Sequence, residues 1–455
     1  MDTTIKNRFD SLNAFYRSGA TRNIDFRIDA LRRFEKSVRA HEEEIAQALW
    51  QDLHKSPEEA YVTETAIVLE EIRTQVRNIR KWARPQKKRS PLFMFPSSSR
   101  VIYEPKGVVF ILAPWNYPLQ LLFDPLAGAI AAGNCVALKP STTSAATCTV
   151  MKKIVSEVFP ENYVACFDGG HEQTAELLTM RFDHIFFTGG AAFGRTVMAE
   201  AAKNLVPVTL ELGGKSPCIV DAGADTDIAA RRIVWGKLAN AGQTCIAPDY
   251  LFVHRSLKDE LLVKMAASIE RFYGKDPRQS PGYPRIVSDK AFARLNGYLQ
   301  GPGRIVRGGQ TDPDDRYIAP TFIEDPDVES PLMQEEIFGP ILPVMAFDDI
   351  RTVVDFVNSR EKPLAFYYFG KIRKAKEVLS RTTSGGACVN DTLLHVGNNR
   401  LPFGGVGMSG MGRYHGRYSF ETFSNMRGTV FSKNSLDMAM RYPPYKKVKT
   451  LKKIM

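Results

Sequence analysis

The best candidates for chemistry in this chain are a cysteine and a glutamate. Cys245 lies in the small-residue run NAGQTCIAP (240–248), and Glu211 lies upstream in TLELGGKSP (209–217). A thiol can attack a carbonyl carbon, and a carboxylate can then activate the water that releases the acyl group. The pair therefore predicts covalent catalysis through a thioester. Taken alone, a single cysteine in a loop is more often inert than catalytic.

Other segments could hold a cofactor that carries phosphate. In FTGGAAFG (187–194), which follows an apolar run and opens a helical stretch, Gly189, Gly190 and Gly194 would let backbone amides approach a pyrophosphate. The spacing differs from GxGxxG, so this run alone reads as a glycine turn. Lys139 ends another apolar run and could reach ribose hydroxyls or phosphate, although a lone lysine there is usually a surface charge.

Two loops carry side chains that could stabilise an oxyanion or bind a nicotinamide cofactor. In APWNYP (113–118), two prolines fix the loop, and the amide of Asn116 could donate a hydrogen bond to a developing oxyanion. In EEIFGP (335–340), a carboxylate could bind ribose hydroxyls and Phe338 could lie against a nicotinamide ring. Each loop has a plain alternative reading: an asparagine in a turn, and an acidic loop before a strand.

The elements around these motifs predict an α/β protein. Helical spacing marks residues 1–80, as at Ile28, Leu31, Phe34 and Val38, and the segment 84–99, rich in proline, serine and basic residues, interrupts it. Apolar runs that alternate with helical stretches follow at 107–112, 135–138, 163–167, 184–187 and 208–212, with a second such series from 216 to about 401. Apolar strands joined by helices predict parallel sheets covered on both faces, with ligands at the carboxyl ends of the strands.

Composition sets the class of protein. A chain of 455 residues predicts two or three domains, and 44% hydrophobic with 24% charged residues is typical of a soluble globular enzyme. The six cysteines are scattered without a CxxC pair or a Cys/His cluster, which argues against a disulfide scaffold and predicts no metal site. Since the N-terminus lacks the order of a signal peptide and no apolar run reaches the roughly 18 residues that span a bilayer, we expect a cytoplasmic protein.

The net charge of +11 raises the question of an anionic partner. Lysine and arginine are spread along the chain, apart from 87–89 and a tail that carries Lys446, Lys447, Lys449, Lys452 and Lys453. Such a tail can hold an anionic membrane or a nucleic acid electrostatically, but a solvated, frayed terminus is the commoner case. We expect no nucleic acid partner, and weak peripheral membrane contact of this tail is a minor hypothesis.

In this order, the motifs make the chain resemble the aldehyde dehydrogenase superfamily, and particularly its class 3 branch, over about residues 27–444. The carrying runs are APWNYP, KPS (139–141), FTGG…G, LELGGKSP, GQTC (242–245), EEIFGP and the glycine-dense segment that ends in SFETFS (402–424, with gaps). The GQTCIAPDY loop, VND (389–391) and the YHG…SFETF ending favour class 3.

The resemblance implies a role for each candidate. Cys245 would be the nucleophile, Asn116 the oxyanion donor together with the Cys245 backbone amide, and Glu211 the general base. The residues implied in cofactor binding are Lys139 and Glu336 at the two riboses, Phe338 against the nicotinamide, Gly189 and Gly194 beside the pyrophosphate, and Gly213 close to the nicotinamide. Tyr117 and Trp235 match aromatic positions that line the class 3 substrate tunnel, with ordinary core aromatics as the equal alternative.

The resemblance also implies a layout and a reaction. The fold would be two doubly wound, parallel-sheet (Rossmann-like) domains with a small β oligomerisation arm. The NAD(P)-binding domain would span 1–83 and 102–211, the catalytic domain 212–405, and the arm and C-terminal tail 84–101 and 406–455, in a homodimer. The reaction would be NAD- or NADP-dependent oxidation of medium- or long-chain aliphatic, or aromatic, aldehydes to carboxylic acids.

Three departures and two alternatives refine this expectation. Many NAD-preferring members carry a glutamate three positions after the lysine of KPS, where this chain has Thr142, so we expect NADP to be accepted. Gly190 stands where the superfamily often has serine, and the tail lacks the apolar helix of membrane-anchored members. An acylating, coenzyme A-dependent relative remains open but is disfavoured by Glu211. A non-catalytic binding or structural protein on the same fold is disfavoured by the intact set of Cys245, Glu211 and Asn116.

Overall fold

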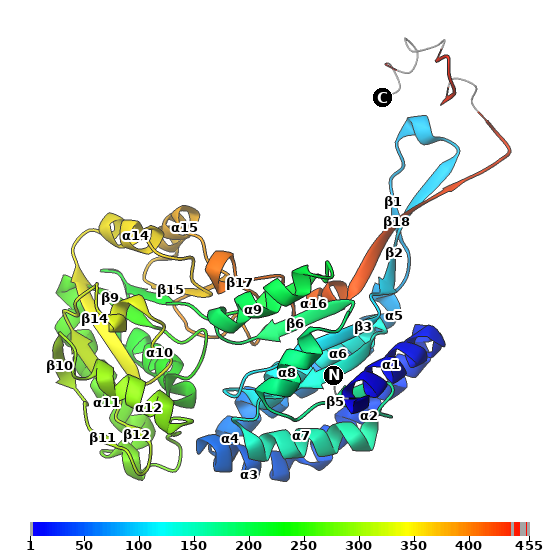
Figure 1. Cartoon of the computed structure of the whole chain (residues 1–455). Coiled ribbons are helices and arrows are strands. Elements are labelled where there is room, and N and C mark those ends of the chain that lie inside the picture. The colour runs from blue at the N-terminus through cyan, green and yellow to red at the C-terminus, as the bar shows by residue number, and fades with distance from the viewer. Residues whose placement is uncertain (1–2, 438–440, 446–451, 453–455) are drawn as a thin grey trace.

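The computed structural model describes residues 3–437, 441–445 and 452. Two α/β bodies lie side by side, and a narrow β arm extends away from the N-terminal body (Figure 1). A mainly parallel sheet forms the centre of each body. The predicted α/β class with two parallel-sheet domains is therefore confirmed.

The N-terminal body contains a six-stranded sheet in the order β17-β7-β6-β3-β4-β5. The strands are β3 (Val108–Leu112), β4 (Cys135–Lys139), β5 (Val164–Cys166), β6 (His184–Thr188), β7 (Val208–Glu211) and β17 (Gly410–Met411). All are parallel except β17, which pairs antiparallel with β7. The chain order reverses between β3 and β6, and open parallel sheets bind ligands at the carboxyl ends of the strands beside such a reversal. The predicted oxyanion motif follows β3, and two of the predicted cofactor motifs follow β4 and β6.

Helices cover this sheet, so every residue of β3, β4 and β6 is buried. Those before the sheet are α1 (Thr3–Arg17), α2 (Ile24–Ala40), α3 (Glu42–Leu53), α4 (Pro57–Ala60), a π-helical turn (Tyr61–Thr65) and α5 (Ala66–Trp82). Those between its strands are α6 (Pro118–Ala132), α7 (Ala145–Val158), α8 (His171–Leu178) and α9 (Ala191–Ala202). On α2, the residues with helical spacing (Ile28, Leu31, Phe34 and Val38) are all buried, as predicted.

The second body contains a seven-stranded sheet in the order β10-β13-β14-β9-β8-β15-β16, parallel except for β10. The strands are β8 (Pro217–Val220), β9 (Tyr250–His254), β10 (Arg304–Arg307), β13 (Thr321–Glu324), β14 (Ile341–Phe347), β15 (Ala365–Phe369) and β16 (Gly386–Val389). A small ladder pairs β11 (Thr311–Asp312) with β12 (Tyr317–Ile318). The helices are α10 (Thr226–Leu238), α11 (Lys258–Tyr273), α12 (Asp289–Tyr298), α13 (Pro331–Gln334), α14 (Ile350–Asn358) and α15 (Ile372–Arg381).

The arm is an antiparallel sheet of β1 (Gln86–Lys88), β2 (Ser97–Pro105) and β18 (Ser424–Ser432). The segment expected to break the helical pattern therefore forms a hairpin, and β18 pairs with β2 along its whole length. The structure differs from the sequence-based boundary after residue 405. β17 joins the six-stranded sheet and α16 (Arg417–Thr422) packs on α6. The C-terminal part of the chain therefore belongs to the arm only from Ser424 onward.

Two features are absent from the described part of the chain. No helix there is long and apolar enough to cross a bilayer. No group of three or more histidine, cysteine or acidic side chains there could hold a metal ion. Of the tail lysines in the membrane hypothesis, only Lys452 is described; Lys446, Lys447, Lys449 and Lys453 lie outside the described residues.

Candidate active site

A cavity of about 260 Å³ opens where the predicted catalytic residues meet. Cys245, Glu211, Tyr117 and Trp235 all line it, at the carboxyl end of β7, the start of α6 and the loop after α10. The rest of the wall is mainly apolar and includes Val62, Ile67, Leu121, Leu212, Leu364 and Leu394. Trp235 is 39% exposed and therefore is no core residue, whereas Tyr117 is buried.

The loop that carries Cys245 has an unusual backbone. Asn240 and Ala241 both have φ of 51° and Gly242 has φ of 75°, so three successive residues adopt left-handed conformations. Such conformations cost energy outside glycine and collect at functional sites. A side chain on Gly242 would meet the Gly339 carbonyl oxygen at 2.3 Å, so this position requires glycine. The loop is a preorganised turn.

The buried side chain of Gln243 fixes the conformation of the same loop through hydrogen bonds. Its Nε2 donates to the carbonyl oxygens of Asn240 (3.1 Å) and Arg285 (3.0 Å), and its Oε1 accepts from the Val287 amide (3.0 Å). The side chain is fully buried and its polar atoms are satisfied, as stable buried polar groups require. The Gln of the GQTC run thus holds the loop in place.

Cys245 is half-buried, and its surroundings disfavour the thiolate. Burial raises the pKa of the thiol well above its usual range, and the nearby carboxylates of Glu336 and Glu211 raise the pKa further. The backbone amides of Cys245 and Ile246 act in the opposite direction. Since a thiolate is the reactive form, Cys245 needs a base, a nearby positive charge or displacement of a carboxylate to react.

Glu211 ends β7 and is 3% exposed. Neither carboxylate oxygen has a hydrogen-bond partner among the described residues. Burial raises the pKa of this carboxyl well above its usual range, against a smaller opposing effect of Arg413. A carboxyl group with free acceptor positions and a raised pKa beside a cavity is a stronger base than an exposed glutamate and is suited to accept a proton from water.

Asn116 follows β3 and is 2% exposed. Its Nδ2 donates to the carbonyl oxygen of Gln243 at 2.9 Å, two residues before the thiol. An amide nitrogen carries two hydrogens, so one remains after this bond. The structure therefore brings Asn116 to the Cys245 loop, as the resemblance implied.

Two predicted cofactor glycines begin α9. Gly190 stands at its N-cap without a side-chain cap, which leaves amides at a helix N-terminus for an anionic group. A Cβ on Gly194 would lie 2.7 Å from Leu212 Cδ2, so glycine lets α9 approach that residue. The Gly189 amide instead donates to the Glu211 carbonyl oxygen at 3.0 Å. A Cβ on Gly190 would meet nothing within 4 Å, so the departure from serine does not alter the fold.

Lys139 and Thr142 lie beyond β4. Lys139 is 6% exposed, its Nζ donates to the Pro140 carbonyl oxygen at 2.9 Å, and burial lowers its pKa. It is therefore not an ordinary surface lysine. Thr142 is exposed at the following turn, where an approaching ligand can reach it.

Glu336 and Phe338 belong to the loop before β14. Glu336 Oε1 accepts from the Gly214 amide at 3.2 Å, and a Cβ on Gly213 would lie 2.1 Å from Oε2, so a side chain at position 213 would displace this carboxylate. Burial, with a contribution from Asp249, raises the pKa of Glu336 to about 8. Phe338, with φ of 51°, packs edge-to-face on Trp115 at 5.5 Å.

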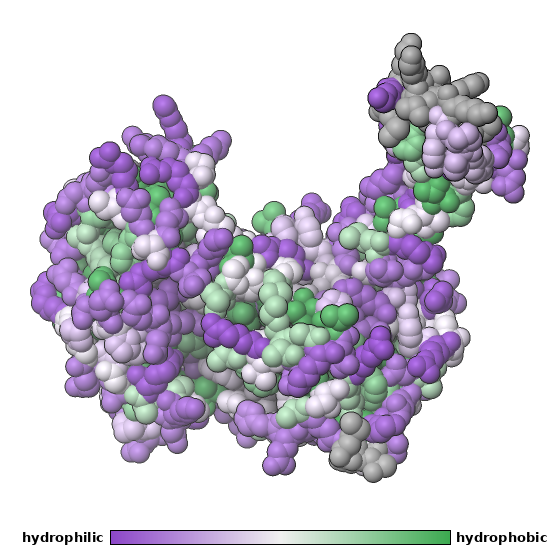
Figure 2. Space-filling model, turned by 45° about the horizontal axis from the view of Figure 1, so that its top comes forward, coloured by the Kyte–Doolittle hydropathy of each residue, from purple (hydrophilic) through white to green (hydrophobic). Residues whose placement is uncertain are grey.

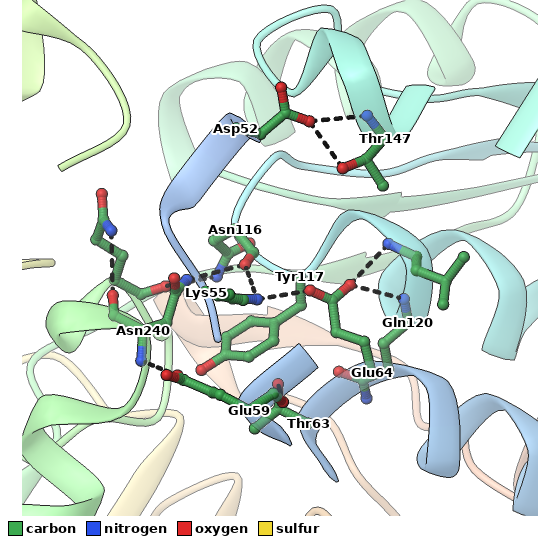
Figure 3. Close-up of polar contacts among 12 residues, drawn as sticks. Asp52, Lys55, Glu59, Thr63, Glu64, Asn116, Tyr117, Gln120, Thr147 and Asn240 are labelled. Carbon is green, nitrogen blue, oxygen red and sulfur yellow. Dashed lines mark hydrogen bonds and ion pairs between the residues drawn. The ribbon is translucent and has the colours of Figure 1, made fainter. Parts of the chain in front are cut away.

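The sequence reasoning missed a buried polar network behind the site (Figure 3). Tyr117, predicted only to line a tunnel, also shares a hydrogen bond with Thr244 at 2.6 Å. Lys55 and Glu64 form a fully buried ion pair at 2.5 Å, and Lys55 Nζ donates to the Asn116 carbonyl oxygen at 2.9 Å. No local pattern distinguishes Lys55 and Glu64 from the charged residues around them, so only the tertiary structure identifies them.

Comparisons with known proteins agree with this geometry. Residues 10–429 match the model of the aldehyde dehydrogenase family. The chain is 44% identical over 97% of both chains to 4,4'-diaponeurosporen-aldehyde dehydrogenase of Staphylococcus aureus. It is 46% identical to aldehyde dehydrogenase family 3 member B1 of Mus musculus (97% of this chain, 95% of the relative). It is 42% identical to the dimeric NADP-preferring aldehyde dehydrogenase of Canis lupus familiaris (95% and 96%).

A solved structure gives the same result at the level of the fold. The substrate-bound state of Staphylococcus aureus AldH superposes with a TM-score of 0.96 at 43% identity and covers 99% of each chain. The family model and these relatives extend over almost the whole chain, including both sheets and the cavity between them. The chain therefore belongs to the aldehyde dehydrogenase family, in its class 3 branch, and is an NAD(P)-dependent enzyme that oxidises aldehydes.

Proposed function

We propose that this enzyme converts apolar aldehydes to carboxylic acids through a thioester on Cys245, with Glu211 as general base. The observation that carries the proposal is that Cys245 and Glu211 open onto one apolar cavity, while Asn116 bonds to the same loop. The three groups come from different elements, and their convergence supplies a nucleophile, a base and an oxyanion donor.

In the first half of the reaction, Cys245 Sγ bonds to the aldehyde carbon, the thiol proton passes to solvent, and the carbonyl oxygen becomes an alkoxide. The free N–H of Asn116 and the Cys245 backbone amide donate to that oxygen. Each such donor typically contributes about 3 kcal/mol to the transition state. The alkoxide then re-forms a carbonyl bond as the carbon loses its hydrogen with two electrons, which leaves a thioester on Cys245.

The residues around the cavity fit a nicotinamide dinucleotide, which accepts that hydride when bound. The uncapped N-terminus of α9 suits its pyrophosphate, and Lys139 and Glu336 suit its two riboses. Glycine at position 213 leaves the Glu336 carboxylate in place, which a side chain would displace. Engagement of Glu336 by a ribose would also draw its carboxylate from Cys245, which would lower the pKa of the thiol.

In the second half, Glu211 takes a proton from water, and the water oxygen bonds to the thioester carbon. The C–S bond then breaks, the carboxylic acid leaves, and Cys245 regains a proton. The oxygens of Glu211 support this role, since among the described residues no side chain or backbone group bonds to them in place of the water.

The cavity wall supports medium- and long-chain aliphatic or aromatic aldehydes as substrates. Burial of one methylene group contributes about 0.8 kcal/mol, or roughly fourfold in binding. We expect kcat/KM to rise about fourfold per methylene over a series of linear aldehydes until the chain exceeds the cavity. Absorbance of the reduced nicotinamide measures this, and a flat or falling series would contradict the assignment.

A pair of variants tests whether this preference belongs to the cavity. Trp235 lines the cavity and Phe272 lies on α11, and both are 39% exposed. Trp235→Ala should reduce the gain in kcat/KM from long chains, because it removes apolar wall area. Phe272→Ala removes a comparable exposed aromatic elsewhere and should leave the series unchanged.

We also infer that NADP serves as well as NAD, because Thr142 carries no charge that would repel a 2′-phosphate. A hundredfold or greater preference of the wild-type enzyme for NAD in kcat/KM would contradict this. Thr142→Glu should lower kcat/KM for NADP by roughly a hundredfold, since juxtaposed like charges cost several kcal/mol, and should spare NAD. Thr149→Glu, at an exposed position of α7, adds the same charge as a control.

The arm supports a homodimer. Apolar side chains gather on it (Figure 2), with Leu92, Phe95 and Phe431 at 71%, 60% and 49% exposed. Exposed apolar area of this kind suits a protein interface, and one relative is named dimeric. The six cysteines are unpaired, in accordance with a reducing, cytoplasmic location.

A further inference from the structure

We propose that Lys55, held by Glu64, positions the oxyanion site of this enzyme. The inference rests on the proposed role of Asn116 and adds a residue that does not reach the reacting atoms. Lys55 lies between α3 and α4, and Glu64 lies in the π-helical turn before α5, outside both sheets. Figure 3 shows their side chains meeting behind Asn116 and Tyr117.

The burial of this pair calls for an explanation. Both side chains are 0% exposed, and Lys55 Nζ lies 2.5 Å from Glu64 Oε1. Removing two charges from water offsets most of their mutual attraction, so a buried ion pair is weak evidence for a gain in stability. A role in fixing one conformation accounts for the pair better.

The pair fixes the segment that contains Asn116. Lys55 Nζ donates to the Asn116 carbonyl oxygen at 2.9 Å and lies 3.9 Å from the centroid of the Tyr117 ring. Glu64 Oε2 accepts from the amides of Leu119 (2.8 Å) and Gln120 (3.4 Å) in the first turn of α6. One ion pair thus contacts four of the five residues from 116 to 120.

That segment in turn holds the Cys245 loop. Asn116 Nδ2 donates to the Gln243 carbonyl oxygen at 2.9 Å, and Asn240 Nδ2 donates to the Asn116 carbonyl oxygen at 2.9 Å. Tyr117 bonds to Thr244, the residue before the thiol. Lys55 therefore sets the distance between the two oxyanion donors, the Asn116 amide and the Cys245 backbone amide.

Glu59 adds a second connection of the same kind. Its Oε1 accepts from the Asn240 amide at 2.6 Å, which ties the first of the three left-handed residues to the N-terminal helices. The segment from 55 to 64 thus bonds both to Asn116 and to the loop that carries the Cys245 amide. Since the ammonium of Lys55 is neutralised by Glu64, its effect on the reaction is geometric.

The test is a double-mutant cycle on the full-length enzyme. Lys55→Met with Glu64→Gln removes both charges together and leaves no unpaired buried ion. We measure the rate of the first turnover of reduced-nicotinamide formation in the wild type, this variant, Asn116→Ala, and the combination. The Lys55/Glu64 variant should slow the first turnover about ten- to a hundredfold, as small misplacements of catalytic groups do, with the KM for cofactor unchanged.

The combination decides whether Lys55 acts through Asn116. If it does, adding Lys55→Met/Glu64→Gln to Asn116→Ala should change the rate by less than about threefold. The inference would be overturned if Lys55→Met/Glu64→Gln slowed Asn116→Ala by the same ten- to hundredfold factor by which it slows the wild type. It would also be overturned if the Lys55/Glu64 variant had the wild-type rate. If Asn116→Ala alone keeps the wild-type rate, the proposed oxyanion role of Asn116 fails instead, and the two failures are thus distinguished.

Two further variants separate positioning from folding. Thr147→Val removes a bond of 2.7 Å to Asp52 in the same region, with no contact to Asn116 (Figure 3). It should lower the melting temperature while the first-turnover rate stays at the wild-type value. If Lys55→Met/Glu64→Gln does not fold, Glu64→Gln alone retains an acceptor for the Leu119 amide but weakens the hold on Lys55. It should give a smaller loss with the same non-additivity, and a wild-type rate in this variant would count against the inference.

Discussion

Replacing Cys245 by alanine is expected to abolish the formation of reduced cofactor from every aldehyde, with a fall in kcat of roughly four orders of magnitude or more. Without the sulfur atom, no thiohemiacetal forms, and the aldehyde carbon has no route to lose its hydrogen as hydride. Absorbance of the reduced nicotinamide measures the loss. The melting temperature should change little, because Cys245 is half-buried and its loop is fixed mainly by Gln243 and its backbone.

Cys388 provides the matched control. Among the six cysteines, Cys245 and Cys388 are half-buried and the other four are buried. Cys388→Ala should keep the wild-type kcat, which shows that the effect belongs to one thiol and not to any accessible thiol. Turnover that survives in Cys245→Ala would show that the thioester mechanism is wrong.

Glu211→Gln is expected to separate the two halves of the reaction. Glutamine has nearly the same shape but accepts no proton at neutral pH, and loss of a general base typically costs a factor of about 10² to 10⁴. The variant should release about one equivalent of reduced cofactor per active site rapidly and then turn over slowly. Mass spectrometry of the trapped protein should show an added acyl group on Cys245.

The pH dependence of acyl release in the wild type tests the same role of Glu211. Burial raises the pKa of Glu211, so its carboxyl is protonated at acidic pH and must lose the proton to serve as a base. Acyl release should therefore accelerate as the pH rises through that pKa, and this limb should vanish in Glu211→Gln. If the variant shows no burst and slows the first turnover equally, Glu211 acts before hydride transfer, on the thiol.

Coenzyme A distinguishes the acylating alternative. The wild type should form free acid from aldehyde and NAD(P) alone, because Glu211 has free oxygens to activate water. Turnover that requires coenzyme A and produces the thioester of that thiol would contradict the assigned role of Glu211.

The central strands of the N-terminal sheet could be predicted from sequence. The runs at 107–112, 135–138 and 184–187 became β3, β4 and β6 with shifts of one residue at most. Uninterrupted apolar runs of this length, bounded by glycine or proline, have few alternatives to a strand buried on both faces. Pairings between distant segments were less predictable, and β17 and α16 joined the first body although they were expected in the arm and tail.

The chemistry available to this protein can be read from its sequence, because the order of the motifs identifies the thiol, the carboxylate and the amide as those of one family. How these groups affect one another depends on the fold. It placed Glu336 close enough to raise the pKa of Cys245, and it put Lys55 and Glu64 beside Asn116. Among the residues that the structure describes, it left the Glu211 carboxylate without a hydrogen-bond partner. Charge interactions and hydrogen bonds depend on distances of a few ångströms. Between residues far apart in the chain, folding alone sets such distances.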